Sequence, residues 1–233
     1  MPTRLFSYGE NFGAPDCDVP LGRWHYIPTR PPVVLDWWQT EAPAAVSAPF
    51  TTVGNWRQSS KELVWNGRRL SWSKDEEFAR FLDLPVRSAQ AFELALSFLD
   101  EASRTMLIGK GWRVADAAAL SRDTYRRYIQ QSRGEFTVAK AQNIVLRSGW
   151  FSDRSACYLA AGRPVITQDT AFGNIIPTGR GLFAFQTMDD VLAAVEAIQA
   201  DPAGQCRAAR EIAAEWFAAE KVLGRVMIDT GLL

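Results

Sequence analysis

Three short stretches of the chain combine glycine, serine, arginine and aspartate as anion-binding loops do. They are Thr52–Arg57, Arg147–Ser155 and Gln168–Asn174. Each lies where the residue pattern predicts the end of a strand or the start of a helix. In sheets whose strands alternate with helices, ligands bind beyond the carboxyl ends of the strands, at loops that lead into helix N-termini. The three loops therefore predict one shared site for a small anionic ligand.

The first loop follows a β-rich run that stops at Gly54 and Asn55. A glycine lets a ligand approach the backbone, and Arg57 adds a fixed positive charge. The alternative is an ordinary strand turn with a surface arginine. Lys140 follows another predicted strand and is either a second cation for the anion or a solvated side chain.

The second loop runs into a predicted helix over residues 152–161, which ends at Gly162. Free N–H groups at a helix start, with nearby serine and arginine side chains, form a phosphate-binding cradle. The competing interpretation is that Ser152 or Asp153 is only an N-cap, and the two roles are compatible. The cradle predicted here consists of Ser152, Asp153, Arg154 and Ser155.

The third loop places small and polar residues where a diphosphate or a sugar would lie. Asp169 is suited to a hydrogen bond with a sugar hydroxyl, or it only ends the strand before it. Thr170, Phe172 and Gly173 complete the predicted sugar side of the site. Trp56 and Trp150 are either stacking partners for a nucleobase or core residues.

The composition argues against several classes of partner and ligand. Lys+Arg and Asp+Glu number 26 each among 233 residues, so the basic excess typical of nucleic-acid-binding proteins is absent. Three widely spaced cysteines and the single His25 suggest neither a disulfide framework nor a metal site, and no cofactor is predicted. No signal-peptide pattern and no apolar run of about 18 residues occurs, which predicts a cytoplasmic protein without a transmembrane segment.

The first 49 residues differ from the rest of the chain. They hold eight of the twelve prolines, together with many aromatic residues. Proline favours extended backbone, whereas aromatic side chains argue against a disordered tail. This segment is therefore predicted to pack onto another domain, with one strand over residues 32–36.

From Phe50 onward, strands alternate with helices. Buried strands are predicted over residues 50–53, 91–96, 136–138 and 164–167. Capping patterns at Ser73 and Thr187 start two of the helices, and Pro85 is expected to end the first. The order predicts an α/β fold, a doubly wound parallel sheet with a Pro- and aromatic-rich N-terminal extension.

The stretch from Tyr158 to Glu220 resembles the donor-binding domain of GT-B glycosyltransferases. The run Leu159 to Asp169 matches the helix, glycine, proline-valine strand and acidic loop of that family, and Gly179 to Phe185 resembles its next short strand. Residues 132–140 and 148–155 are similar to a bacterial group 1, spore-maturation-type family of glycosyltransferase-like proteins.

The resemblance implies a division of the chain into three parts. Residues 1–49 would be a remnant of the N-terminal acceptor-binding domain and linker. Residues 50–205 would be a Rossmann-like domain that binds a nucleotide-diphosphate sugar without a metal, and residues 206–233 a helix that packs back toward the N-terminal segment. A separate N-terminal polypeptide or a homodimer would have to complete the enzyme.

One departure from the family bears on activity. Many retaining members carry two glutamates where Gly149 and Cys157 stand here. Phosphate binding would survive this loss better than nucleoside recognition or catalysis. Two hypotheses therefore remain: a glycosyltransferase-like donor-binding protein, and a non-catalytic truncated domain that binds a partner protein. A nucleotide-sugar epimerase of the same fold would need several acidic and histidine groups.

Overall fold

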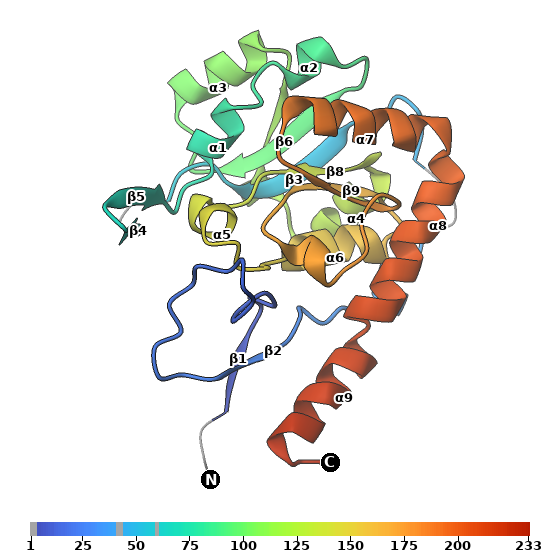
Figure 1. Cartoon of the computed structure of the whole chain (residues 1–233). Coiled ribbons are helices and arrows are strands. Elements are labelled where there is room, and N and C mark those ends of the chain that lie inside the picture. Colours follow the sequence, from blue (N-terminus) through green and yellow to red (C-terminus); the bar gives the residue numbers. More distant parts are fainter. Residues whose placement is uncertain (1–3, 41–43, 59–60) are drawn as a thin grey trace.

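The computed structural model describes residues 4–40, 44–58 and 61–233. Its centre is a sheet of six parallel strands in the order β10-β9-β8-β3-β6-β7 (Figure 1). A parallel pair and an antiparallel hairpin lie outside it. The strands are β1 (Leu5–Ser7), β2 (Tyr26–Pro28), β3 (Phe50–Asn55), β4 (Glu62–Trp65), β5 (Arg68–Ser71), β6 (Phe92–Ser97), β7 (Arg113–Asp116), β8 (Gly134–Thr137), β9 (Val165–Gln168) and β10 (Leu182–Phe185).

Helices cover both faces of the sheet, so the predicted doubly wound α/β fold is confirmed. In Figure 1, α1, α2, α3 and α7 lie over one face, while α4 and α6 lie over the other. The α-helices are α1 (Asp75–Ala79), α2 (Leu84–Arg87), α3 (Glu101–Gly109), α4 (Arg122–Gln131), α5 (Ala141–Val145), α6 (Asp153–Ala160), α7 (Met188–Ala200), α8 (Pro202–Ile212) and α9 (Ala219–Thr230).

The core forms two layers because successive side chains of a strand point to opposite faces. Phe136 of β8 lies in the layer under α1, α2, α3 and α7, together with many other aromatic rings. The second layer surrounds Tyr158 and Leu159 of α6. It also receives Val33 and Trp38 from the N-terminal part of the chain.

Two local predictions are wrong. The expected strand over residues 32–36 is a single bridge between Val33 and Ala218, followed by a 3-10 turn at Leu35–Trp38. The expected cap at Ser73 is also absent, since α1 begins after Lys74 without a side-chain cap. Pro85 lies in the first turn of α2, a position that proline tolerates. The capping box at Thr187, by contrast, is confirmed with Asp190.

The N-terminal segment, residues 5–28, lies below α5 and α6 in Figure 1, and α9 projects beside it. The segment is joined to the sheet domain by backbone contacts. Gly9 forms a bridge with Trp150, and the N–H of Asn11 donates to the carbonyl of Ser148. It therefore borders the loop that precedes α6.

Candidate functional site

The sheet has a topological switch point between β3 and β8. From β3 the chain moves outward through β6 to β7, then returns to the other side of β3 with β8. Such a reversal opens a crevice beyond the carboxyl ends of the two strands, which is where sheets of this kind bind ligands. Here β3 pairs with β8 only at Phe50 and Thr51, so the two strands separate toward their carboxyl ends.

Arg154 of α6 fills the gap between the two strands. Its Nη1 donates to the Val53 carbonyl of β3 at 2.6 Å, and its Nη2 donates to Thr137 Oγ1 of β8 at 2.9 Å. Its Nε forms an ion pair with Glu135 at 2.5 Å. The Glu135 side chain is 0% exposed and that of Arg154 is 12% exposed. All three bonds join Arg154 to the sheet beneath it, so its charge is largely neutralised inside the fold.

Lys74 brings a second cation to the same place. Its residue is 9% exposed, and its ammonium donates to Thr137 Oγ1 at 3.3 Å. Within residues 4–40, 44–58 and 61–233, no carboxylate lies within ion-pair distance of this ammonium. Burial, followed by the positive charge of Arg154, holds the pKa of Lys74 well below its usual value. The charged form of Lys74 is therefore disfavoured here, and an anion bound beside it would stabilise that form.

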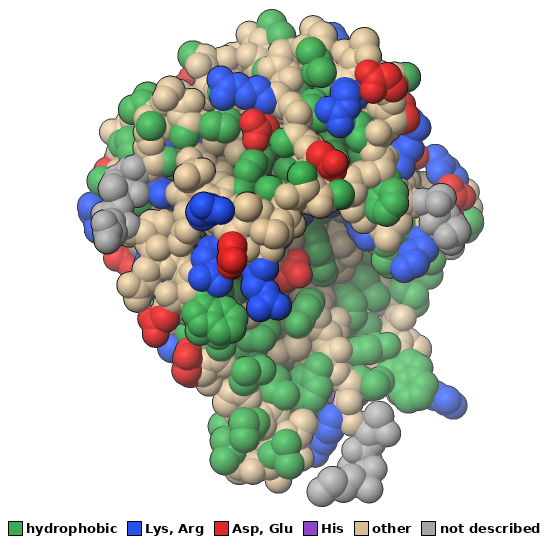
Figure 2. All heavy atoms as spheres, turned by 180° about the vertical axis from the view of Figure 1, so that it is seen from behind, with side chains coloured by type: hydrophobic (Ala, Val, Ile, Leu, Met, Phe, Trp, Pro, Cys, Tyr) green, Lys and Arg blue, Asp and Glu red, His purple; other side chains and the backbone are tan. Residues whose placement is uncertain are grey.

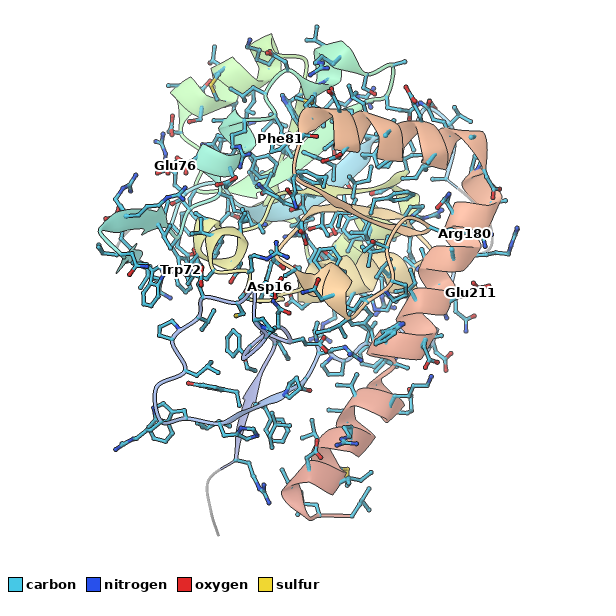
Figure 3. All side chains as sticks on the ribbon, in the orientation of Figure 1. Asp16, Trp72, Glu76, Phe81, Arg180 and Glu211 are labelled. Atoms are coloured by element: carbon cyan, nitrogen blue, oxygen red, sulfur yellow. The ribbon has the colours of Figure 1, made fainter. Side chains whose placement is uncertain are left out.

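Lys140 stands on the next loop, at the start of α5. Its Nζ donates to Gln58 Oε1 at 3.1 Å and lies 4.5 Å from the ring centroid of Trp72, a residue labelled in Figure 3. Burial and the charge of Lys61 lower the pKa of Lys140. Lys140 also lowers the pKa of Lys74, so the two ammonium groups act on one region.

The N-terminus of α6 completes what we call the cationic cradle: Lys74, Lys140 and the helix start at Ser152. Ser152 is 5% exposed and its hydroxyl makes no capping hydrogen bond. The carboxylate of Asp153 accepts from the Arg154 N–H, and it is exposed. Free N–H groups and the helix dipole at this end favour an anion.

The predicted residues divide into those at the cradle and those buried elsewhere. Gly54 lies beside Arg154, since a Cβ there would stand 3.6 Å from the Arg154 guanidinium. Asn55 is exposed at the end of β3. Ser155 is 0% exposed, and its hydroxyl has no partner among the described residues. Trp56 is also in the core, stacked 5.7 Å from Phe78.

Arg57 is engaged by two carboxylates. Its guanidinium contacts Asp75 at 2.8 Å and Asp100 at 2.7 Å. Its neighbours Trp56 and Gln58 each bond a lysine of the cradle, Lys74 and Lys140. Arg57 thus borders the cradle, but its charge is paired with Asp75 and Asp100.

The third loop packs against the second and against the N-terminal segment. Thr170 Oγ1 donates to the Trp150 carbonyl at 2.7 Å, and Phe172 lies in the core against Phe151, with ring centroids 5.2 Å apart. Gly173 is exposed. Asp169 accepts from the backbone N–H of Ala171, which has a left-handed φ of 74°. These contacts join the third loop to the second loop and to the core.

Asp16 fastens the N-terminal segment to these loops (Figure 3). Its carboxylate accepts from Asn11, from Arg147 at 2.8 Å and from Asn174. These bonds lower its pKa to about 2, with the Asn11 hydrogen bond as the largest cause. Arg147 also lies 3.7 Å from Asp169. The N-terminal segment and the third loop are therefore linked through the carboxylate of Asp16.

We expect the contacts of Asp16 that fasten the N-terminal segment to weaken at low pH. Because the pKa of Asp16 is lower in the folded chain than the ordinary value of 3.8, its contribution is complete above about pH 4 and is lost as the pH falls through about 2. Proteolysis with pepsin, followed by mass spectrometry, should show faster cleavage in residues 5–28 across that window. Asp16→Asn should already be cleaved faster at pH 4 and show little further change. Equal rates for both chains would contradict the role of Asp16.

Sequence reasoning missed Lys74. The run Ser73 to Glu76 reads as a capping box, which leaves its lysine without a role. A lysine just before a helix and close to the end of a neighbouring strand is a weak signal on its own. Its burial beside Thr137 depends on contacts between residues 63 positions apart.

The β3–β8 switch point and the helix that begins at its carboxyl edge define a Rossmann-like, doubly wound fold. No protein-family model matches the sequence, and no curated protein matches it. Solved structures share the fold. TarM has a TM-score of 0.59 at 11% identity, over 87% of this chain and 38% of its own. Sucrose-phosphate synthase of Thermosynechococcus elongatus has a TM-score of 0.58 at 14% identity, over 89% and 52%.

A third similar structure is Anabaena Alr3699/HepE in complex with UDP and glucose. Its TM-score is 0.57 at 12% identity, over 89% of this chain and 57% of its own. The chain spans between about two fifths and three fifths of the length of these three proteins. These neighbours are GT-B glycosyltransferases, so the chain has the fold of part of a GT-B protein.

No helix in the described part of the chain is both long and apolar enough to cross a membrane. Likewise, no group of three or more histidine, cysteine or acidic side chains gathers there in a way that could hold a metal ion.

Proposed function

We propose that the cationic cradle binds the diphosphate of a nucleotide-diphosphate sugar. The observation that carries the proposal is the Lys74 ammonium, which is buried at the switch point, donates to the Thr137 hydroxyl and has no carboxylate at ion-pair distance among the described residues. A buried cation without a counter-charge is costly, and an incoming anion removes that cost. Lys140 and the N–H groups at Ser152 and Asp153 supply further donors.

In this proposal Arg154 positions the site and does not contact the ligand directly. It fixes Thr137, the hydroxyl that holds Lys74, and it separates the ends of β3 and β8. Gly54 and Asn55 border the same opening. The sugar would extend toward the third loop, where Asp169, Thr170 and Gly173 lie, with Phe172 and Ser155 as supporting core residues.

The chemistry supported by this arrangement is stabilisation of a departing nucleoside diphosphate. Preorganised donors that face developing negative charge lower the barrier to glycosyl transfer without a covalent protein intermediate and without a metal. The exposed carboxylate beside the cradle, that of Asp153, accepts from the Arg154 N–H at the helix start. We propose that the general base for transfer comes from an acceptor-binding partner, either a separate polypeptide or a second copy of this chain. The three free cysteines are consistent with a cytoplasmic setting.

A second candidate is a non-catalytic interaction module. It is favoured by apolar side chains over α9 and the N-terminal segment, which Figure 2 shows on the lower part of the molecule. Leu223 is 49% exposed, Ile228 is 59% exposed and Trp24 is 50% exposed. Exposed apolar patches of this kind mark sites of protein association.

Nucleotide binding separates the two candidates. We expect isothermal titration calorimetry to detect at least one of UDP, GDP, dTDP, CDP and ADP, and also inorganic pyrophosphate. Lys74→Met keeps the volume of the side chain and removes its charge. It should weaken binding by about 10- to 150-fold, which corresponds to the roughly 1.5–3 kcal/mol of a hydrogen bond to a charged group. Its thermal stability should be equal or higher, because a buried cation is gone.

The matched control is Lys110→Met on the far side of the fold. Lys110 is exposed and pairs with Asp83, so its loss should leave nucleotide affinity unchanged. If the wild type binds none of these ligands at millimolar concentration, the donor-binding proposal fails and the interaction module takes its place. If Lys74→Met binds as tightly as the wild type, the cradle is not the anion site.

A further inference from the structure

Phe98 is an aromatic side chain in an unfavourable position. Its residue is 73% exposed, and its φ of 56° lies in the left-handed region. Both features are disfavoured, since bulky residues rarely adopt this backbone and an exposed ring gains nothing from burial. No aromatic contact to this ring occurs in the part of the chain that the structure describes. Folding alone therefore gives no reason for a phenylalanine here.

Phe98 follows the carboxyl end of β6, at the same edge of the sheet as the cradle. Two backbone hydrogen bonds connect the neighbouring segments. The Trp56 N–H donates to the Ser97 carbonyl at 2.9 Å, and the Lys74 N–H donates to the Trp56 carbonyl at 3.3 Å. The segment that carries Phe98 is thus hydrogen-bonded to Trp56, and Trp56 is in turn hydrogen-bonded to Lys74.

This spacing suits a nucleotide. Segments joined by a backbone hydrogen bond lie roughly 5 Å apart, so the two bonds in series place the Phe98 segment on the order of 10 Å from the backbone of Lys74. A ligand whose diphosphate occupies the cradle would reach that far with its ribose and base. Asn55, which pairs in register with Ser97, is exposed at the same edge of the sheet.

We propose that the Phe98 ring is the stacking platform for the planar base of the nucleotide. This inference rests on the proposed function, because the diphosphate must sit in the cradle for the base to reach the ring. Stacking on an aromatic side chain accepts any base, since every base has a π-face. It would supply nucleoside recognition in a chain whose sequence departs from the family at Gly149 and Cys157.

The surroundings of Phe98 favour a polar planar ligand over an apolar protein surface. Arg57, Asp75 and Asp100 form an ion-pair group on the adjacent loops. Charged groups of this kind are depleted at the centre of protein interfaces, whereas the edges of a base carry donors and acceptors that such groups can meet.

The test compares two ligands on one set of variants by calorimetry. For Phe98→Ala we expect nucleoside diphosphate affinity to fall by about 5- to 150-fold, the range reported for loss of one stacking partner. Inorganic pyrophosphate affinity should not change. Phe98→Trp should retain nucleotide affinity, and Lys74→Met should lose affinity for both ligands. Val86→Ala, an exposed apolar residue on α2, is the matched control and should bind both as the wild type does.

Stability gives a second readout. Phe98→Gly should raise the unfolding midpoint, because glycine adopts the left-handed backbone without steric cost, while nucleotide affinity falls as in Phe98→Ala. Equal nucleotide affinity for wild type and Phe98→Ala, with pyrophosphate binding intact, would overturn the stacking role alone. A wild type that binds neither ligand would overturn the cradle and the stacking role together. A Phe98→Ala variant that changes only the self-association of the protein would also overturn the stacking role.

Discussion

Arg154→Ala should lower the free energy of unfolding by about 3–5 kcal/mol, the usual cost of removing one partner of a buried ion pair. The reason is the position of Glu135, whose side chain is 0% exposed. Without the guanidinium, this carboxylate is buried without a counter-charge. The Val53 carbonyl and the Thr137 hydroxyl also lose a donor. Urea unfolding followed by circular dichroism measures the change.

The double variant Arg154→Met/Glu135→Gln should recover part of this loss, because neither charge is then left buried. Arg57→Ala is the control, since the Arg57 side chain is 57% exposed and solvent screens its ion pairs. If Arg154→Ala unfolds at the urea concentration of the wild type, the pair is not a structural element. Loss of nucleotide binding in Arg154→Ala would by itself say little, because the fold and the cradle both depend on this residue.

Arg154 illustrates what sequence reasoning can and cannot reach. An arginine after a serine at a predicted helix start is the pattern of a phosphate ligand, and the helix is present at Asp153–Ala160. The partner of that arginine is Glu135, 19 residues earlier and on another element. No local pattern reveals that pairing, because it is fixed by how α6 packs on β8.

The strands and helices with strong local signals were predictable. The β-branched run at Pro164–Thr167 and the capping box at Thr187 each correspond to an observed element, β9 and α7. Their signals are local and agree with the packing around them. The run Pro32–Asp36 failed because its backbone pairs at one residue only, Val33, and then turns so that Trp38 enters the core.

The hairpin of β4 and β5 carried a signal that the sequence interpretation did not use. Asn66 and Gly67 connect the two strands, and both have a left-handed φ, 48° and 74°. An Asn-Gly pair between two strand-like runs is the preferred two-residue hairpin turn. Lys74 follows this hairpin, so recognising it would have placed that lysine near the sheet edge.

The site itself was predictable only as a region. Alternating strands and helices direct attention to the carboxyl ends of the strands, and the residues named there do border the switch point. Which side chains face a ligand depends on burial. Ser155 and Phe172 are in the core, whereas Phe98 is exposed although its sequence neighbourhood resembles a buried strand end. Exposure of this kind follows from tertiary packing and not from residue type.

Phe136→Ala should also cost about 3–5 kcal/mol of unfolding free energy, the range for truncating a buried phenylalanine. The Phe136 ring stacks on Phe185 at 5.4 Å and is 1% exposed. It has edge or tilted contacts with other rings of the same layer: Phe78, Phe81, Phe92 and Trp112. Removing it opens a cavity that these rings cannot fill without leaving their own positions. Phe136→Leu, which leaves a smaller cavity, should cost less.

This variant separates the fold from the cradle because β8 divides its side chains between two layers. Phe136 enters the aromatic layer, while its neighbours Glu135 and Thr137 contact Arg154 on the other side. We expect Phe136→Leu, measured where it is fully folded, to bind pyrophosphate like the wild type in spite of its lower urea midpoint. Lys74→Met should show the reverse, an unchanged or higher midpoint with weakened binding. If Phe136→Leu lost affinity as Lys74→Met does, the two layers of β8 would be coupled, and burial of Lys74 would depend on the aromatic layer as well as on Thr137.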